Sequence, residues 1–277
     1  MKVLISLDEL KDARLSMDGL VGLVPTMGYL HEWHLSLVRS AREDCSNVVL
    51  TIFVNPTQFG QNEDLAKYPR DLERDLNLIQ PLGVDLVWAP TPEIMYPGGF
   101  QTWVEVERLT QGLEGAIRPG HFKGVATVVA KLFNAVQPHK AYFGQKDAQQ
   151  AAVIRRMTRD LNFPLEIVVC PTVREPDGLA MSSRNKYLDI EERKAAVVLF
   201  RALSAAQAAY HAGERKAEKL RVIMREILGA EPRSQAQYVS CADYDTLEEL
   251  EEIEGKTLLS MAVMVGKTRL IDNFVLD

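Results

Sequence analysis

The chain has 277 residues, 47% of them hydrophobic, so it is long enough to bury the core of one large domain or of two domains. Its 32 lysines and arginines against 38 aspartates and glutamates give a net charge of −6, which argues against a nucleic-acid-binding surface. The three cysteines lie far apart without metal-ligand spacing, and neither a signal region nor an apolar run near the ~18 residues of a membrane span is present, so we expect a globular cytoplasmic protein with no membrane partner.

Strands and helices are predicted to alternate between residues 21 and 169. Short β-branched apolar runs predict the strands, and apolar residues that recur with helical spacing predict the helices. The expected strands are residues 21–24, 48–54, 84–88, 141–143 and 165–169. The expected helices are residues 35–41, 68–80, 125–136 and 148–160. This alternation predicts an α/β fold with a doubly wound parallel sheet, whose ligands bind outside the carboxyl ends of the strands.

The character of the sequence changes after Val173. A polar loop at residues 174–185 is followed by an alanine-rich stretch that predicts helices from about residue 191 to residue 228. In the tail, an acidic helix is expected at residues 246–254, and two strands are expected at 258–265 and 268–275. We therefore predict a domain built on the parallel sheet at 1–174 and a smaller α+β domain at 175–277.

The residues that follow the first predicted strand suit a phosphate group. Pro25 and Gly28 end the strand before His31 and His34 open a helix. A spacing of three places both imidazoles on one face, and the first helical turn offers unpaired N–H groups and the positive end of the helix dipole. Without further context, two ordinary surface histidines are an equally good interpretation. A zinc site is less favoured, because the spacing is not that of a metalloprotease and no third ligand is evident.

Three other polar segments also suit a phosphate or another polar group of a ligand. Asn55-Pro-Thr-Gln58 follows a strand, and its amides can donate to and accept from hydroxyl and carboxylate groups. Lys146 can reach a phosphate near Gly144, and Gln150 lies one turn further on. Met181-Ser-Ser-Arg184 offers two hydroxyls and a guanidinium for a triphosphate. Taken singly, each segment is more often a turn, a solvated lysine or a linker.

Three further side chains have two interpretations each. His121 precedes a helix, where it either faces a ligand or is a packed or capping residue. Asp71 and Asp75 either help to hold a metal ion through water or lie on a solvated helix face, and the solvated face is the favoured interpretation.

Eight motifs, taken in order along nearly the whole chain, strongly resemble those of the pantothenate synthetase (pantoate–β-alanine ligase) family. They are Pro25-Thr-Met-Gly…His31-x-x-His34, Asn55-Pro-Thr-Gln-Phe-Gly60, Tyr68-Pro-Arg70, Met95-Tyr-Pro97, Arg118-Pro-Gly-His-Phe-x-Gly-Val125, Tyr142-Phe-Gly-Gln-Lys-Asp147, Met181-Ser-Ser-Arg-Asn185 and Gly266-Lys-Thr-Arg-Leu-Ile-Asp-Asn273. Each motif alone is common, but the ordered set is specific. The resemblance implies an ATP-dependent ligase that joins pantoate to β-alanine through a pantoyl-adenylate, on a Rossmann-like nucleotidyltransferase domain with a C-terminal lid.

The resemblance also implies roles for individual residues. His34 would be the acid, and both His34 and His31 would contact the ATP phosphates. Lys146 and Arg184 would neutralise the charge that develops on the phosphates. The residues expected to hold pantoate are Gln58, Gln150 and Asn55. Gln58 would also border the β-alanine site. The other residues expected to line the ATP site are Met27, Gly28, Gly144, Gln145, Asp147, Val173, Met181, Ser182 and Ser183.

The substrates implied by the resemblance are pantoate, β-alanine and ATP with Mg²⁺. No tightly bound organic cofactor is expected, and the metal ligands are left open. The resemblance further suggests a homodimer, whose interface the periodicity of the sequence does not identify.

Position 33 departs from the family pattern, which has glycine between Glu32 and His34 where this chain has Trp33. Glycine lets a backbone and a nucleotide approach closely, whereas an indole adds a large ring and restricts the backbone. We therefore predict weaker ATP binding than in a Trp33→Gly variant. Two other functions stay open: a nucleotidyltransferase of the same superfamily that leaves the nucleotide on its product, against which Gln58 and Gln150 argue, and a nucleotide-binding protein impaired by Trp33.

Overall fold

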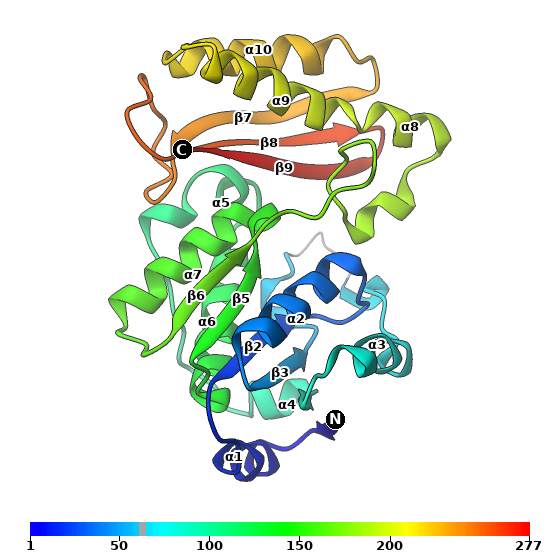
Figure 1. Ribbon diagram of the computed structural model, residues 1–277, viewed down its shortest axis with the longest axis vertical. Coiled ribbons are helices and arrows are strands. Elements are labelled where there is room, and N and C mark those ends of the chain that lie inside the picture. Colours follow the sequence, from blue (N-terminus) through cyan, green and yellow to red (C-terminus); the bar gives the residue numbers. More distant parts are fainter. Residues whose placement is uncertain (61–64) are drawn as a thin grey trace. The chain divides into compact units, whose positions relative to one another are not determined.

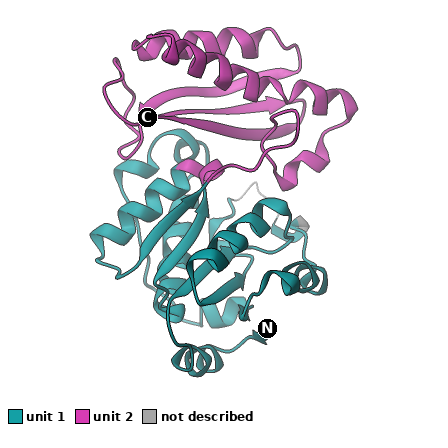
Figure 2. Ribbon diagram, viewed as in Figure 1, with its two compact units in different colours: residues 1–144, 149–170 teal, residues 145–148, 171–277 magenta. Residues whose placement is uncertain are grey.

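The computed structural model describes residues 1–60 and 65–277, and these residues divide into two compact units (Figure 2). Unit 1 comprises residues 1–144 and 149–170, and unit 2 comprises residues 145–148 and 171–277. The short segment 145–148 therefore makes its contacts with unit 2 although unit 1 flanks it in sequence. The domain division at residue 174 stays a prediction.

Unit 1 is built on a parallel sheet, which has six strands within the described ranges, in the order β1-β4-β3-β2-β5-β6 (Figure 1). The strands are β1 (Lys2–Leu4), β2 (Val21–Thr26), β3 (Asn47–Ile52), β4 (Leu86–Trp88), β5 (Lys140–Gly144) and β6 (Glu166–Cys170). The predicted Rossmann-like parallel sheet is confirmed. Strand β2 pairs with β3 on one side and β5 on the other, so the strand order reverses there. Ligands of such sheets bind at this reversal, outside the carboxyl ends of the strands.

Helices flank this sheet (Figure 1). They are α1 (Leu7–Leu15), α2 (Glu32–Asp44), α3 (Leu72–Ile79), α4 (Pro92–Met95), α5 (Leu113–Ile117), α6 (His121–Val136) and α7 (Ala148–Asp160). Helix α2 buries Leu35, Leu37, Val38 and Ala41, which share a core with Val24 and Leu50 of the strands beneath. Because α2 and α7 join strands that progress in opposite directions across the sheet, right-handed crossovers place these helices on opposite faces.

Unit 2 contains an antiparallel sheet of β7 (Ser234–Asp243), β8 (Thr257–Val265) and β9 (Thr268–Leu276), in that order. Its helices are α8 (Ile190–Ala195), α9 (Val198–His211) and α10 (Ala217–Gly229). Leu203 of α9 and Met224 of α10 are fully buried and share one core with Leu259 and Met261 of β8. The predicted smaller α+β fold, with its helices and its last two strands, is confirmed.

The acidic helix predicted for residues 246–254 is wrong. The Asp243 carboxylate accepts the backbone N–H groups of Asp245 (3.0 Å) and Thr246 (2.7 Å), which turns the chain just after β7. The Leu250 N–H then donates to the Cys241 carbonyl (3.0 Å), so this segment returns along β7. Backbone groups that bond to a strand are not available for the i→i−4 ladder of a helix.

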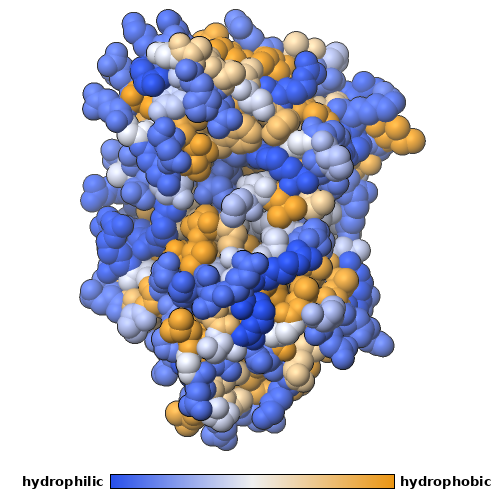
Figure 3. Space-filling model, in the orientation of Figure 1, coloured by the Kyte–Doolittle hydropathy of each residue, from blue (hydrophilic) through white to orange (hydrophobic). Residues whose placement is uncertain are grey.

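The described residues include no helix that is long and apolar enough to span a membrane. On the face drawn in Figure 3, small groups of hydrophobic residues lie among hydrophilic ones. Cys45, Cys170 and Cys241 are buried free thiols.

Candidate active site

The turn between β2 and α2 has a backbone conformation that depends on glycine. Gly28 has φ +81°, and a Cβ there would lie 3.0 Å from Ile52 Cγ2. Glycine populates this left-handed region without a steric penalty. The Thr26 hydroxyl accepts the Gly28 N–H (3.2 Å) and donates to the Thr51 carbonyl (2.7 Å), so the turn is tied to β3. The sequence therefore ends β2 sharply and directs the chain into α2.

Asp75 of α3 holds the same turn from the other side. Its carboxylate is 1% exposed and accepts the backbone N–H groups of Tyr29 (2.6 Å) and Leu30 (2.7 Å). Burial raises the pKa of Asp75 above its ordinary value, while the two N–H donors oppose that rise. The favoured prediction of a solvated helix face is wrong for Asp75, which is a buried acceptor for the turn. Asp71 is exposed and caps α3 by accepting the Arg74 N–H (3.1 Å).

Replacing Asp75 by asparagine is expected to lower the free energy of unfolding by about 1–3 kcal/mol. An amide offers one acceptor oxygen, and its NH₂ group would face the second backbone N–H, which then stays buried without a partner. Urea denaturation measures the loss. Asp71→Asn is the matched control, because asparagine caps a helix about as well as aspartate does. Equal losses in the two variants would contradict this role of Asp75.

The two histidines lie where the sequence predicts them, at the start of α2. His31 is the N-cap residue and His34 is in the first turn, with the ring centroids 4.4 Å apart. The His31 backbone N–H donates to His34 Nδ1 (3.3 Å). Because Nδ1 is an acceptor, a neutral His34 imidazole carries its proton on Nε2, which is then a hydrogen-bond donor.

Trp33 lies between these histidines in sequence and packs beside both rings. Its ring centroid is 4.7 Å from that of His34 and 5.9 Å from that of His31. The indole also covers Gly144 at the end of β5, where a Cβ would lie only 2.4 Å from Trp33 Nε1. Within the described part of the chain, Nε1 is buried and has no hydrogen-bond partner. Trp33 therefore covers the carboxyl end of β5, the strand that pairs with β2 where the strand order reverses.

Asn55 is buried behind Gln58 after β3. It is 1% exposed, and its amide nitrogen donates to the Gly124 carbonyl (3.2 Å) and to Gln58 Oε1 (3.2 Å). Its amide oxygen accepts from the hydroxyls of Thr57 (3.0 Å) and Tyr96 (2.9 Å). Asn55 thus orients the Gln58 side chain, and its own contact with pantoate stays a prediction.

Two neighbours complete the surroundings of Gln58. Gln58 Nε2 donates to Met27 Sδ (3.0 Å), which joins the segments after β3 and β2. His121 Nδ1 lies 2.8 Å from the Gln58 carbonyl oxygen, so the half-buried His121 side chain holds the Gln58 backbone. Gln150 is half-buried on α7, whereas the adjacent Gln149 is buried and donates to the Leu109 carbonyl (2.8 Å).

In unit 2, Lys146, Ser182 and Arg184 line one small pocket. Lys146 is 8% exposed in the turn Gln145–Asp147, and Arg184 is exposed. The Ser182 hydroxyl accepts the Arg184 N–H (3.2 Å) and so starts the turn Ser183–Tyr187. The Met181 N–H donates to the Val173 carbonyl (2.9 Å), which closes the loop between them. The structure therefore brings together the residues of unit 2 that the sequence assigns to phosphate binding.

No group of three or more histidine, cysteine, aspartate or glutamate residues that could hold a metal ion occurs in residues 1–60 and 65–277. A Mg²⁺ ion that arrives with ATP needs no such group, because it usually binds substrate phosphates and waters with one or two carboxylates.

Comparison with known proteins tests the family directly. The model of the family described as pantoate-beta-alanine ligase matches residues 2–275. The chain belongs to the pantoate–β-alanine ligase family. It is 62% identical to the pantothenate synthetase of Roseiflexus sp. (strain RS-1) over 277 residues, which is the full length of both chains.

Solved structures agree with this family. The crystal structure of the pantothenate synthetase from Thermus thermophilus is 50% identical, with a TM-score of 0.93 over 99% of each chain. The pantoate–β-alanine ligase from Francisella tularensis, described as complexed with beta-gamma ATP and beta-alanine, is 32% identical, with a TM-score of 0.79 over 99% of this chain and 97% of that one. The resemblance of the ordered motifs to this ligase family is thus confirmed.

The structural roles of two further residues were not expected from the sequence. Tyr96, in the motif Met95-Tyr-Pro97, donates to Asn55, and its burial raises the pKa of its hydroxyl, which keeps it a donor. Asp75 supports the turn before His31. The motif signals Tyr96 without giving its role, and no local pattern signals the burial of Asp75.

Proposed function

We propose that the chain condenses pantoate with β-alanine to form pantothenate, using ATP and releasing AMP and pyrophosphate. The observation that carries this proposal is the family match over residues 2–275. A relative of known structure is described as complexed with ATP and β-alanine, two of the three substrates. The paired histidines at the strand-order reversal support a phosphate site at that place.

In the first step, a pantoate carboxylate oxygen attacks the α-phosphorus of ATP, and pyrophosphate leaves. We assign His34 Nε2–H as a donor to the phosphate oxygens, with His31 beside it. The Lys146 ammonium and the Arg184 guanidinium stabilise the negative charge that builds up in the transition state. The ATP site further includes Met27, Gly28, Gly144, Gln145, Asp147, Val173, Met181, Ser182 and Ser183.

In the second step, the β-alanine amine attacks the carbonyl carbon of pantoyl-adenylate, and AMP leaves. Gln58 and Gln150 hold the pantoyl group through their amides, and Gln58 also borders the amine. Binding holds the amine and the carbonyl carbon in a reactive orientation, so the step no longer depends on a chance encounter of two free molecules. This positioning accounts for a large part of the acceleration. Asn55 acts here through the orientation of Gln58.

We further propose that Mg²⁺ enters with ATP, that the chain forms a homodimer and that it works in the cytoplasm. Three buried free thiols support a reducing compartment.

Incubation of the chain with MgATP, pantoate and β-alanine tests the reaction. Mass spectrometry should show pantothenate and AMP in equal amounts, together with pyrophosphate, and omission of pantoate should abolish AMP formation. A stable nucleotidyl product would instead indicate a nucleotidyltransferase. ATP binding without any product would indicate a nucleotide-binding protein that Trp33 has impaired.

A further inference from the structure

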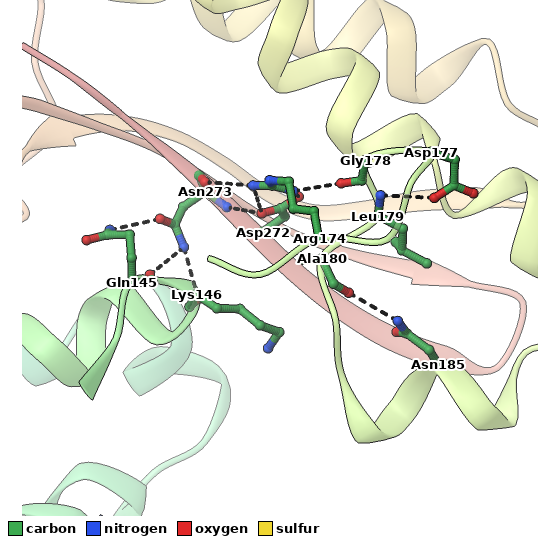
Figure 4. A network of polar contacts seen from close by, with 10 residues as sticks. All are labelled: Gln145, Lys146, Arg174, Asp177, Gly178, Leu179, Ala180, Asn185, Asp272 and Asn273. Atoms are coloured by element: carbon green, nitrogen blue, oxygen red, sulfur yellow. Dashed lines mark hydrogen bonds and ion pairs between the residues drawn. The ribbon is translucent and has the colours of Figure 1, made fainter. Parts of the chain in front are cut away.

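The motif Ile271-Asp272-Asn273 on β9 has no role in the scheme above, yet Asn273 contacts the turn that carries Lys146 (Figure 4). Asn273 is 4% exposed, and its amide nitrogen donates to the carbonyl oxygens of Gln145 (3.0 Å) and Lys146 (2.9 Å). Its amide oxygen accepts from Gln145 Nε2 (2.9 Å). One side chain thus satisfies both backbone carbonyls at the root of the Lys146 side chain.

A second layer of contacts holds Asn273 in place. The Asp272 carboxylate, 2% exposed, accepts the Asn273 backbone N–H (2.8 Å) and forms a two-pronged ion pair with Arg174 (2.7 and 2.9 Å). The Arg174 guanidinium lies over the rings of Phe200 (5.1 Å) and Phe274 (4.9 Å). A bidentate, stacked arginine is a rigid arrangement, so the backbone of β9 at Asn273 has little freedom to shift.

The same arginine also reaches the loop that leads to Arg184. Arg174 Nη1 donates to the Gly178 carbonyl (2.9 Å), and Asn185 Nδ2 donates to the Ala180 carbonyl (3.1 Å) (Figure 4). The Arg174 backbone also pairs with Ala180 in an isolated β-bridge, which links these contacts. Arg174 therefore supports both the turn that carries Lys146 and the loop that leads to Arg184.

We propose that Asn273 is a positioning residue for Lys146, and this inference rests on the proposed function. A lysine side chain is long and flexible, so the place of its ammonium depends on a fixed backbone at its root. Only an amide meets the demands at position 273, because it donates twice to carbonyls and accepts once. An aspartate of the same shape would place carboxylate oxygens against the two carbonyls.

Asn273→Asp is therefore expected to reduce the rate of pyrophosphate release in a single turnover by about tenfold, since small misplacements of a catalytic group have effects of this order or larger. The ratio kcat/KM for β-alanine should stay within about twofold, because it reports the reaction of β-alanine with an adenylate that has already formed. Gln235→Glu, an exposed amide on β7, is the matched control for the added charge and should keep the wild-type rate. Asn273→Ala, which removes the bonds without adding a carboxylate, covers the case in which Asn273→Asp fails to fold.

A double-mutant cycle with Lys146→Ala separates positioning from a general structural role. If Asn273 acts through Lys146, the double variant should be no slower than Lys146→Ala alone, although each single variant is slower than wild type. The inference would be overturned if the rate losses of the two single variants multiplied in the double variant, or if both Asn273 variants kept the wild-type rate. Neither result would affect the proposed ligase function, which the wild-type chain tests. A wild-type chain that forms no pantothenate would remove the proposed function, and the inference with it.

Discussion

Trp33→Gly is expected to tighten MgATP binding by about 10- to 100-fold, which corresponds to about 1.4–2.8 kcal/mol. The indole covers Gly144 at the carboxyl end of β5 and packs against the His34 ring. To bind at this edge of the sheet, ATP has to displace the ring or accept a less favourable position, and either requirement lowers its affinity. A glycine at position 33 removes the ring and opens the Gly144 backbone to the ligand.

Isothermal titration of each protein with MgATP, without pantoate, measures this difference. Trp33→Phe is the control, because it keeps an aromatic ring over Gly144 and should recover much less affinity than glycine. Loss of the indole also removes a buried N–H that has no partner among the described residues, which offsets part of the stability that the lost packing costs. Equal ATP affinity in wild type and Trp33→Gly would contradict the steric account.

His34→Ala is expected to lower the rate of adenylate formation by about 10²- to 10⁴-fold, the range for loss of a positioned acid or oxyanion donor. His34 Nδ1 accepts the His31 N–H, so a neutral imidazole carries its proton on Nε2, the atom that we propose donates to the phosphate oxygens. His34→Asn is a sharper variant, since its side-chain oxygen can still accept the His31 N–H although the Nε2 donor is gone. Both variants should therefore be slow.

Single-turnover release of pyrophosphate measures the effect of these variants. His211→Ala, at the exposed end of α9 in unit 2, controls for the loss of an imidazole and should keep the wild-type rate. Full activity in His34→Asn would show that the Nε2 donor does no chemistry and that His34 only supports the start of α2.

Strands β2 to β6 of the parallel sheet could be predicted because their signals are local, whereas the short edge strand β1 was not predicted. Strands such as β3 are short, mostly apolar runs rich in β-branched residues, and burial on both faces of the sheet keeps most of their positions apolar. Strand β7 could not be predicted in this way because Gln235, Ala236 and Gln237 face solvent and are polar or small. The acidic segment after β7 has a composition that suits a helix, whereas the Asp243 carboxylate turns the chain.

In the site, too, the residues with local sequence signals could be predicted and the others could not. The spacing of His31 and His34 is local, so their place at the start of α2 followed from sequence, as did the polar residues after β3 and β5. Asp75 accepts a backbone N–H 45 residues away, and Asn273 donates to a carbonyl 127 residues away. No periodicity or motif spacing encodes such pairings, because they depend on how distant elements pack. The position of the Trp33 ring over Gly144 likewise required the fold.

The most direct test of the proposed chemistry uses pantoate with both carboxylate oxygens labelled with ¹⁸O, together with MgATP and β-alanine. Attack of a carboxylate oxygen on the α-phosphorus makes that oxygen part of the adenylate, and attack of the amine then leaves it on AMP. We predict AMP that carries one ¹⁸O and pantothenate that retains the other in its amide carbonyl. Unlabelled AMP, or ADP with labelled inorganic phosphate, would contradict an adenylate-forming ligase.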